Sequence, residues 1–426
     1  MTVLVVGGGG REHAVIKKLK ENPRVTKIYA APGNGGIAAE AECVPIKATD
    51  VDAMVDFAVA NKIDFCAVIP DDPLVLGMAD DMRCAGIPTF GPSKVAAALE
   101  GSKVFSKNLM KKYGIPTAGY EVFDDPAKAL EYVRAQNSYP TVIKADGLAL
   151  GKGVIIAEDY AAAEAGIKSI MEDKIFGQSG SQIVIEEFLT GPEVSVLSFT
   201  DSHVVIPMIS SMDHKRALDG DKGLNTGGMG TIAPNPFYTP EIAEECMRTI
   251  FLPTMEAMNA EGRPFKGVIY FGLMLTPKGP KVIEYNCRFG DPETQVVLPL
   301  LKKGDLLEIF EACENETLSQ LEIEWDDGAA ACVMMASGGY PQKYETGKEI
   351  TGLSADGQSD SAIIYHSGTK FEGGKYLTAG GRVLGVTARG ANLEEALDKA
   401  YAAAETIHFD GAHYRKDIGK RALDGK

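Results

Sequence analysis

The first 90 residues alternate between short apolar runs and amphipathic stretches, and this alternation constrains the fold more than any other feature. Apolar runs at residues 3–6, 27–31 and 65–69 are separated by helix-like stretches at residues 12–20 and 51–61. Strands that alternate with helices form βαβ units, and such units build a parallel sheet. The sequence therefore predicts an amino-terminal domain with a parallel sheet, which we place at residues 1–102.

Length and composition predict a chain of several domains. It has 426 residues, of which 45% are hydrophobic and 24% charged, and this length suggests about three domains of roughly 150 residues. No apolar run approaches the roughly 18 residues of a membrane-spanning helix. The amino terminus enters a strand directly, without the basic segment of a signal peptide. We therefore expect a cytoplasmic protein with no membrane partner.

Charge and cysteine content argue against several classes of protein. The net charge is −16, from 59 acidic and 43 basic residues, whereas nucleic-acid binding calls for a basic face. The seven cysteines contain no CxxC pair, which argues against a disulfide framework or a zinc ribbon. We expect small-molecule partners, no nucleic acid, and a monomer rather than an oligomer.

A glycine loop follows the first strand, at residues 7–10. It resembles the start of a dinucleotide-binding motif, but Glu12 replaces the third glycine, and no acidic residue ends the second strand, where Pro32 to Gly36 stand instead. NAD recognition needs both features. The loop is instead suited to hold a phosphate or small anion on backbone N–H groups at the start of the helix.

A second unit begins after a helix that stops at Tyr113 and Gly114. It reads as a helix at residues 126–135, a strand at 140–144, a glycine-rich turn at 145–153 and a strand at 154–156. This is not a phosphate-binding loop of the GxxxxGK[ST] type, because the chain leaves the turn as a strand. Lys144 and Lys152 flank the turn, which favours a flap over phosphates. The alternative is an ordinary hairpin.

Two further segments suggest ligand contacts. A strand at 182–186 runs into an apolar linker at 187–193, whose backbone could meet an adenine edge while Glu193 reaches ribose hydroxyls. The segment 213–230 is long, polar and glycine-rich, which is typical of a ligand-binding loop. Within it we expect His214 to be a structural surface residue, since no nucleophile motif accompanies it. His13 is expected to pack against or cap the first helix.

The segment 282–293, VIEYNCRFGDPE, carries the strongest chemical signal. In a strand, Glu284 and Asn286 point to one face while Ile283 and Tyr285 pack behind. Two oxygen donors on one face suit Mg²⁺, which takes few protein ligands and completes its shell with waters and phosphates. Arg288 continues that face if the strand persists, and its planar guanidinium could hold a phosphate. The alternative is a solvated edge strand.

The last unit, residues 326–426, is predicted to have strands at 330–336, 362–366 and 382–388. A final helix starts at Asn392, with Glu395 in the capping-box position. We expect this unit to form a wall of the site.

The glycine flap, the EEFLxGxE linker and the strand with Glu284 and Asn286 together resemble the ATP-grasp superfamily of ligases. More specifically, RFGDPETQVVLP at 288–299 is similar to the signature of the phosphoribosylamine–glycine ligase family, and VVGGGGREHA, PGNGG, DHKRALDGDKGLNTGGMG and GGRVLGVTA extend the likeness over nearly the whole chain. The resemblance implies an α/β and α+β multi-domain fold. Its parts are the amino-terminal parallel-sheet domain, an ATP-grasp domain at 103–325 with a mobile lid at about 120–190, and a small carboxy-terminal α+β domain.

The resemblance also implies a reaction, in which ATP joins glycine to 5-phosphoribosylamine through a glycyl phosphate intermediate during purine synthesis. ATP and Mg²⁺ or Mn²⁺ are the implied cofactors. Arg288 and Asp291 would be catalytic, and Glu284 with Asn286 would bind the metal. The implied ATP-binding residues are Lys103, Lys144, Gly151, Gly153, Glu186, Glu187, Phe188, Leu189 and Glu193. The implied substrate-binding residues are Gly9, Gly10, Arg11, Glu12, Asn34, Asp213, Lys215, Gly227, Gly228, Met229 and Gly230.

Two alternatives remain open at this point. The nearer one is another ATP-grasp ligase of purine synthesis that acts on a different acid, against which the DHKR and RFGDPE segments speak. The more distant one is a nucleotide sensor or NAD-binding protein. A sensor has no need of a second-substrate loop.

Overall fold

The amino-terminal unit of the computed structural model, which describes residues 1–148 and 153–425, contains the predicted parallel sheet. Its strand order is β3-β2-β1-β4-β5, and every pairing is parallel. The carboxyl ends of β1, β2 and β4 therefore meet at one edge, where the glycine loop and Asp71 follow. Its elements are β1 (Thr2–Gly7), α1 (Gly10–Leu19), β2 (Lys27–Pro32), β3 (Glu42–Cys43), α2 (Val51–Ala60), β4 (Phe65–Val68), α3 (Asp71–Leu76), α4 (Met78–Cys84), β5 (Thr89–Phe90) and α5 (Lys94–Gly101).

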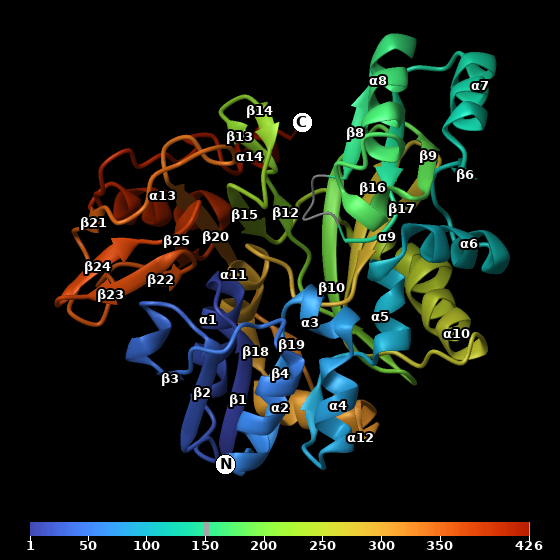
Figure 1. Ribbon diagram of the computed structural model, residues 1–426. Helices are drawn as coiled ribbons and strands as arrows, with labels where there is room; N and C mark the ends of the chain where they lie inside the picture. Colours follow the sequence, from blue (N-terminus) through green and yellow to red (C-terminus); the bar gives the residue numbers. More distant parts are fainter. Residues whose placement is uncertain (149–152, 426) are drawn as a thin grey trace.

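The lid segment projects from the rest of the molecule, at the upper right of Figure 1. Its antiparallel sheet has the order β6-β9-β7-β8, and Lys144 pairs with Val154 across the expected glycine turn. Helix α6 (Lys103–Tyr113) precedes it and ends at Gly114, which has a φ of 69° that suits glycine. The predicted order of strand, turn and strand is confirmed, whereas a flap over phosphates and lid movement stay predictions. Its elements are β6 (Tyr120–Phe123), α7 (Pro126–Gln136), β7 (Thr141–Ala145), β8 (Val154–Ala157), α8 (Tyr160–Met171) and β9 (Ile183–Glu187).

The central sheet has the order β11-β10-β16-β17, and β17 carries the predicted metal ligands Glu284 and Asn286. The register shifts within the β16–β17 pair, because Gly272 pairs with Glu284 whereas Leu273 pairs with Val282. The expectation that Ile283 packs behind the sheet is therefore wrong: this bulge makes Ile283 line a cavity beside Glu284. The elements are β10 (Glu193–Asp201), β11 (Val205–Pro207), α9 (Pro240–Cys246), α10 (Leu252–Ala260), β16 (Lys266–Thr276), β17 (Gly279–Asn286), α11 (Thr294–Val297), β18 (Leu301–Lys303), α12 (Leu306–Asn315) and β19 (Glu324–Trp325).

The carboxy-terminal sheet has the order β12-β15-β20-β25-β22, and its last three strands match the predicted ones. Strands β12 and β15 lie at the two ends of the loop at 213–230. The loop therefore begins and ends in the carboxy-terminal sheet. The tip of the loop is the hairpin β13–β14, drawn in green at the top of Figure 1. The elements are β12 (Met212–Asp213), β13 (Arg216–Leu218), β14 (Lys222–Asn225), β15 (Gly230–Ala233), β20 (Ala329–Ala336), β21 (Glu349–Ile350), β22 (Ile363–His366), β23 (Thr369–Glu372), β24 (Lys375–Thr378), β25 (Arg382–Gly390), α13 (Leu393–Ala404) and α14 (Lys420–Leu423).

Asn392 caps α13 as predicted, whereas Glu395 binds the N–H of Ala391, one residue before the cap, and not the N–H of Asn392 as a capping box would. Asn392 accepts a hydrogen bond from the Glu395 backbone N–H at 2.9 Å, and the Glu395 carboxylate accepts one from the Ala391 N–H at 2.8 Å. In the part of the chain that the structure describes, no helix is long and apolar enough to cross a membrane.

Candidate active site

One cavity of about 620 Å³ collects residues from every unit of the fold. The lid and the central sheet enclose one end of it, while Arg11 at the start of α1, the β17–α11 connection and the carboxy-terminal unit reach the other. Most of the residues implied by the sequence line it. They are Arg11, Lys103, Lys144, Gly153, Glu186, Glu187, Phe188, Leu189, Glu193, Asp213, Lys215, Gly227, Glu284, Asn286, Arg288 and Asp291. Gly151 lies outside the described residues.

Two lysines mark the end of the cavity beneath the lid. Lys103 Nζ donates to the Gly147 carbonyl at 2.8 Å, and Lys144 Nζ donates to the Ile283 carbonyl at 3.0 Å. Burial lowers the pKa of Lys103, against the pull of Glu284. Both ammonium groups therefore lie in the cavity beside the end of β17, where a polyphosphate would bring its negative charge.

The sequence reasoning missed Lys107. It follows Lys103 by one helical turn on α6, a spacing that puts both on one face. Its Nζ lies 3.2 Å from a carboxylate oxygen of Glu186, and Lys144 lies 3.1 Å from the same oxygen. Burial lowers the pKa of Lys107 to about 8. Glu186 thus joins two lysines at the base of the cavity, so its carboxylate is already engaged by protein cations.

The linker after β9 supplies the apolar wall. Phe188 is 38% exposed and lines the cavity with Leu189. The Glu187 carboxylate accepts a hydrogen bond from Gly119 N–H at 2.9 Å and forms an ion pair with Lys281 at 3.2 Å. The Glu193 carboxylate lies 3.4 Å from Lys215 Nζ. Half of the Glu193 side chain is exposed, so it can meet a ligand hydroxyl.

Glu284 and Asn286 face the cavity from the end of β17, as predicted. Burial opposes ionisation of Glu284, but Lys215, Lys144 and Lys103 together lower its pKa. In the described ranges no cluster of three or more His, Cys, Asp or Glu side chains could hold a metal alone. One ionised carboxylate and one amide oxygen beside two lysines are a donor set that fits Mg²⁺ or Mn²⁺ shared with phosphates and waters.

Arg288 lies beyond the end of β17 and lines the cavity on the same side as Glu284 and Asn286. Its Nη2 donates to Asn286 Oδ1 at 3.1 Å, its Nη1 donates to the Phe289 carbonyl at 3.2 Å, and its guanidinium pairs with Glu100 at 3.4 Å. Glu100, on α5, was not anticipated. Burial raises its pKa to about 7, although Arg288 opposes the shift. Glu100 lines the same cavity and holds Arg288 in place there.

Two carboxylates, of Asp213 and Glu293, also line the cavity. Asp213 is half-buried, and desolvation of its carboxyl together with the nearby charge of Glu293 raises its pKa. Tyr270 donates a hydrogen bond to Glu293 at 3.1 Å, and Lys215 acts on both acids. Glu293 and Tyr270 were missed, although Glu293 ends the very motif that was singled out. Two acids that resist joint ionisation can accept a cationic ligand group.

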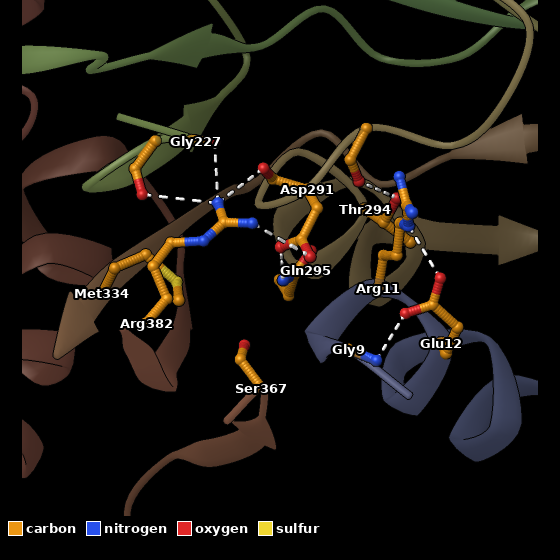
Figure 2. Close-up of polar contacts among 12 residues, drawn as sticks. Gly9, Arg11, Glu12, Gly227, Asp291, Thr294, Gln295, Met334, Ser367 and Arg382 are labelled. Carbon is orange, nitrogen blue, oxygen red and sulfur yellow. Dashed lines mark hydrogen bonds and ion pairs between the residues drawn. The ribbon is translucent and has the colours of Figure 1, made fainter. Parts of the chain in front are cut away.

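Asp291 lies between the carboxy-terminal unit and α11, and Figure 2 shows its partners. Its carboxylate accepts a hydrogen bond from Gln295 Nε2 at 2.6 Å and pairs with Arg382 at 3.3 Å. Burial would raise its pKa, but Arg382 and Arg11 hold it below its usual value. A low pKa makes Asp291 an acceptor of hydrogen bonds rather than a base.

Several expected substrate residues do not line the cavity. Glu12 is buried in its own helix start, where its carboxylate accepts from Gly9 N–H at 2.7 Å and from Arg11 Nε at 2.7 Å (Figure 2). The Asn34 amide donates to the Gly8 and His366 carbonyls at 2.9 and 2.7 Å. Both residues shape the glycine loop. The remaining residues of this group are Gly9, Gly10, Gly228, Met229 and Gly230; Met229 is buried in the core.

The two histidines that were set aside as structural are both buried. His13 accepts a hydrogen bond from the His366 backbone N–H at 2.9 Å, which confirms a packing role. The expectation that His214 lies at the surface is wrong. It is 4% exposed, its Nδ1 lies 3.1 Å from the Gly230 carbonyl, and its Nε2 accepts from Gly419 N–H at 3.0 Å. His214 is covered by the carboxy-terminal segment around Gly419, which is distant in sequence.

This fold and site define an ATP-grasp ligase, and comparison with known proteins gives the family. Models described as the N, ATP-grasp (A) and C domains of phosphoribosylglycinamide synthetase match residues 1–100, 101–294 and 330–421. The chain belongs to the phosphoribosylglycinamide synthetase family.

Individual relatives agree with this assignment. The chain is 49% identical to the phosphoribosylamine–glycine ligase of Clostridium acetobutylicum over 99% of its own length and 100% of that protein. The crystal structure of the same enzyme from Thermotoga maritima is 35% identical, with a TM-score of 0.84 over 98% of this chain and 100% of that one. The biotin carboxylase domain of Hydrogenobacter thermophilus 2-oxoglutarate carboxylase covers 100% of this chain and 95% of its own, with a TM-score of 0.75; at 18% identity it shares only the fold.

Proposed function

We propose that this protein joins glycine to 5-phosphoribosylamine at the expense of ATP, releasing ADP, phosphate and glycinamide ribonucleotide in purine synthesis. The observation that carries the proposal is the end of β17, where Glu284, Asn286 and Arg288 share one side of a cavity with Lys103 and Lys144. Cations and metal ligands gathered in this way fit phosphoryl transfer, which depends mainly on positioning and charge neutralisation.

The first step forms an acyl phosphate. Lys103 and Lys144 hold the phosphates of ATP, the linker at 187–189 holds the adenine, and Glu193 holds the ribose. Arg288 stabilises the charge that develops as the glycine carboxylate attacks the γ-phosphate. Glu284 and Asn286 would hold Mg²⁺ or Mn²⁺, which when bound neutralises phosphate charge.

Glycine itself fits the opposite side of the cavity. The paired acids Asp213 and Glu293 accept its ammonium group, while Lys215 attracts its carboxylate. The glycine loop with Arg11 faces the phosphoribosylamine, whose amine then captures the glycyl phosphate. Closure of the lid at about 120–190 would keep water from that intermediate.

The division of the chain into domains is also part of the proposal. We divide the chain into an amino-terminal domain at 1–102, an ATP-grasp domain at 103–325 and a carboxy-terminal domain at 326–426. The strands β12 and β15 of the ATP-grasp segment complete the carboxy-terminal sheet. We further propose a cytoplasmic monomer, which sedimentation of the purified protein would test.

The decisive experiment measures ADP release with Mg·ATP, glycine and freshly generated phosphoribosylamine, with each component omitted in turn. Turnover that needs all three supports the proposal. Turnover with formate or bicarbonate in place of glycine would show that the enzyme uses a different acid substrate. ATP binding without any turnover would favour a nucleotide sensor.

A further inference from the structure

Arg382 joins three segments of the cavity wall that are distant in sequence. It is the first residue of β25, in the carboxy-terminal unit. Its Nη1 donates to the Gly227 carbonyl at 2.7 Å and to the Asp291 carbonyl at 2.8 Å, and its Nη2 lies 3.3 Å from the Asp291 carboxylate. Figure 2 shows this fork reaching both residues. One guanidinium thus fixes the loop at 213–230 to the connection between β17 and α11.

Tyr340 completes the hold on the loop. Its hydroxyl accepts a hydrogen bond from the Gly227 N–H at 3.1 Å, so both backbone polar groups of Gly227 are bound by the carboxy-terminal unit. A Cβ at position 227 would lie 3.0 Å from the guanidinium carbon of Arg382. The glycine allows this close approach. The hydrogen bonds from Arg382 and Tyr340 therefore fix the position of Gly227, and with it the end of the loop at 213–230.

The clamp formed by Arg382 and Tyr340 lies beside the amino-terminal glycine loop. A Cβ at Gly9 would lie 3.3 Å from the Asp291 carboxylate, and one at Gly10 would lie 2.6 Å from the amide nitrogen of Gln295, the other partner of Asp291. The ATP-side lysines have different partners: Lys103 binds the Gly147 carbonyl, and Lys144 binds the Ile283 carbonyl and Glu186. The clamp thus lies beside the loop that the proposed function assigns to phosphoribosylamine.

We infer that Arg382 is a positioning residue for the acyl-transfer half of the reaction, acting through Asp291 and the Gly227 carbonyl. The inference rests on the proposed function. In that half, the amine nitrogen forms a bond to the glycyl carbonyl carbon, the carbon–oxygen bond to phosphate breaks with its electron pair going to the phosphate oxygen, and one proton passes from nitrogen to phosphate. Asp291, held ionised and oriented, accepts an amine N–H and aims the nitrogen at the carbonyl.

The test separates the two halves of the reaction in the full-length enzyme. Hydroxylamine traps glycyl phosphate as glycine hydroxamate without phosphoribosylamine, so hydroxamate reports the first half and glycinamide ribonucleotide reports both. For Arg382→Gln we expect ligation to fall by about 100-fold, as for a misplaced reacting group, while hydroxamate formation falls by less than about threefold. The matched control is Arg389→Gln, since Arg389 lies on the same strand and forms an exposed ion pair with Asp326; both rates should stay unchanged.

The outcomes are distinct. An equal loss of both rates, or a loss of neither, would overturn the positioning role. Thermal unfolding shows whether Arg382→Gln folds; if it does not, Tyr340→Phe decides, because it removes only the hydroxyl that holds Gly227. That variant should raise the KM for phosphoribosylamine by about tenfold with an unchanged KM for glycine, in line with one lost hydrogen bond, and an unchanged KM for both would contradict the inference. A wild-type enzyme that makes no glycine-dependent hydroxamate would instead refute the proposed function and the inference with it.

Discussion

Arg288 and Asn286 are hydrogen-bonded to each other, with Nη2 of the arginine 3.1 Å from Oδ1 of the asparagine. The residue proposed to stabilise the transferring phosphoryl group is thereby tied to a proposed metal ligand. The same Nη2 lies 3.4 Å from a carboxylate oxygen of Glu100. The proposed metal ligand Asn286, Arg288 and Glu100 thus form one array around a planar cation.

Arg288→Lys should therefore bind ATP but turn over slowly. A lysine presents a point charge and cannot contact Asn286, Glu100 and a phosphoryl oxygen together. We expect kcat to fall by about 100- to 1,000-fold, as for the loss of a donor that stabilises transition-state charge. Steady-state kinetics with ATP binding by calorimetry would check this. Arg263→Lys, at a half-buried site outside the cavity, is the control, and near wild-type turnover of Arg288→Lys would refute the role.

Glu284→Gln should raise the Mg²⁺ concentration needed for half-maximal activity. The substitution keeps the shape of the side chain but removes the charge that Lys215, Lys144 and Lys103 hold ionised. A hard cation loses affinity when its carboxylate ligand becomes an amide. Titration of activity with Mg²⁺ and Mn²⁺ measures the effect, and Glu324→Gln, at a side chain that is 45% exposed and outside the cavity, should behave as the wild type. An unchanged metal requirement would remove Glu284 from the metal site.

The sequence predicted the elements whose signal is local. The βαβ series, the β7–β8 hairpin and the end of β17 each occupy a short window in which residue period and glycine position decide the conformation. The same holds for the faces of Glu284 and Asn286. The bulge at Ile283 could not be predicted, because it depends on how β17 pairs with β16.

Arg382 and Glu100 could not be predicted for the same physical reason. Arg382 contacts Gly227 across 155 positions of sequence, and Glu100 contacts Cys287 across 187. Such contacts follow from how units pack, which residue pattern does not encode locally. Lys107 is the exception, because its helical spacing from Lys103 was visible in the sequence.

His214 should make stability depend on pH. Burial lowers its pKa to about 4, with Arg415 adding to the shift. In the folded chain Nδ1–H donates to Gly230 while Nε2 accepts from Gly419, so protonation of Nε2 would break the second bond. The unfolded chain takes up a proton near pH 6.5, so stability is complete above that value and is lost as pH falls from about 6.5 toward 4.

The expected loss from His214 is about 2 kcal/mol at about pH 5. Urea unfolding at about pH 7.5 and about pH 5 measures it. His13 and His366 are also buried with lowered pKa values, so the contribution is isolated by His214→Gln, which should show a smaller difference between the two pH values. An equal difference in the variant would show that His214 does not cause it.

Arg415 should hold the hairpin β13–β14 over the cavity. Its side chain is 1% exposed, pairs with Asp221 at 2.9 Å and Asp417 at 2.8 Å, and donates to the Arg216 carbonyl at 3.1 Å. Removing one partner of a buried ion pair leaves the other charge uncompensated. Because Asp221 is partly exposed, Arg415→Met should lower the free energy of unfolding by about 2 kcal/mol, below the range for fully buried pairs.

The same variant should also affect catalysis, because Arg216, Asp221 and Asn225 of the hairpin line the cavity. A hairpin released from the carboxy-terminal segment would be cleaved faster by trypsin at Arg216 or Lys222, and the KM for glycine would rise. Lys416→Met is the matched control, since its side chain is exposed and only its backbone N–H binds the hairpin, at Asp219. If cleavage at the hairpin were equally slow in Arg415→Met and Lys416→Met, the buried arginine would stabilise the carboxy-terminal unit without fixing the substrate loop.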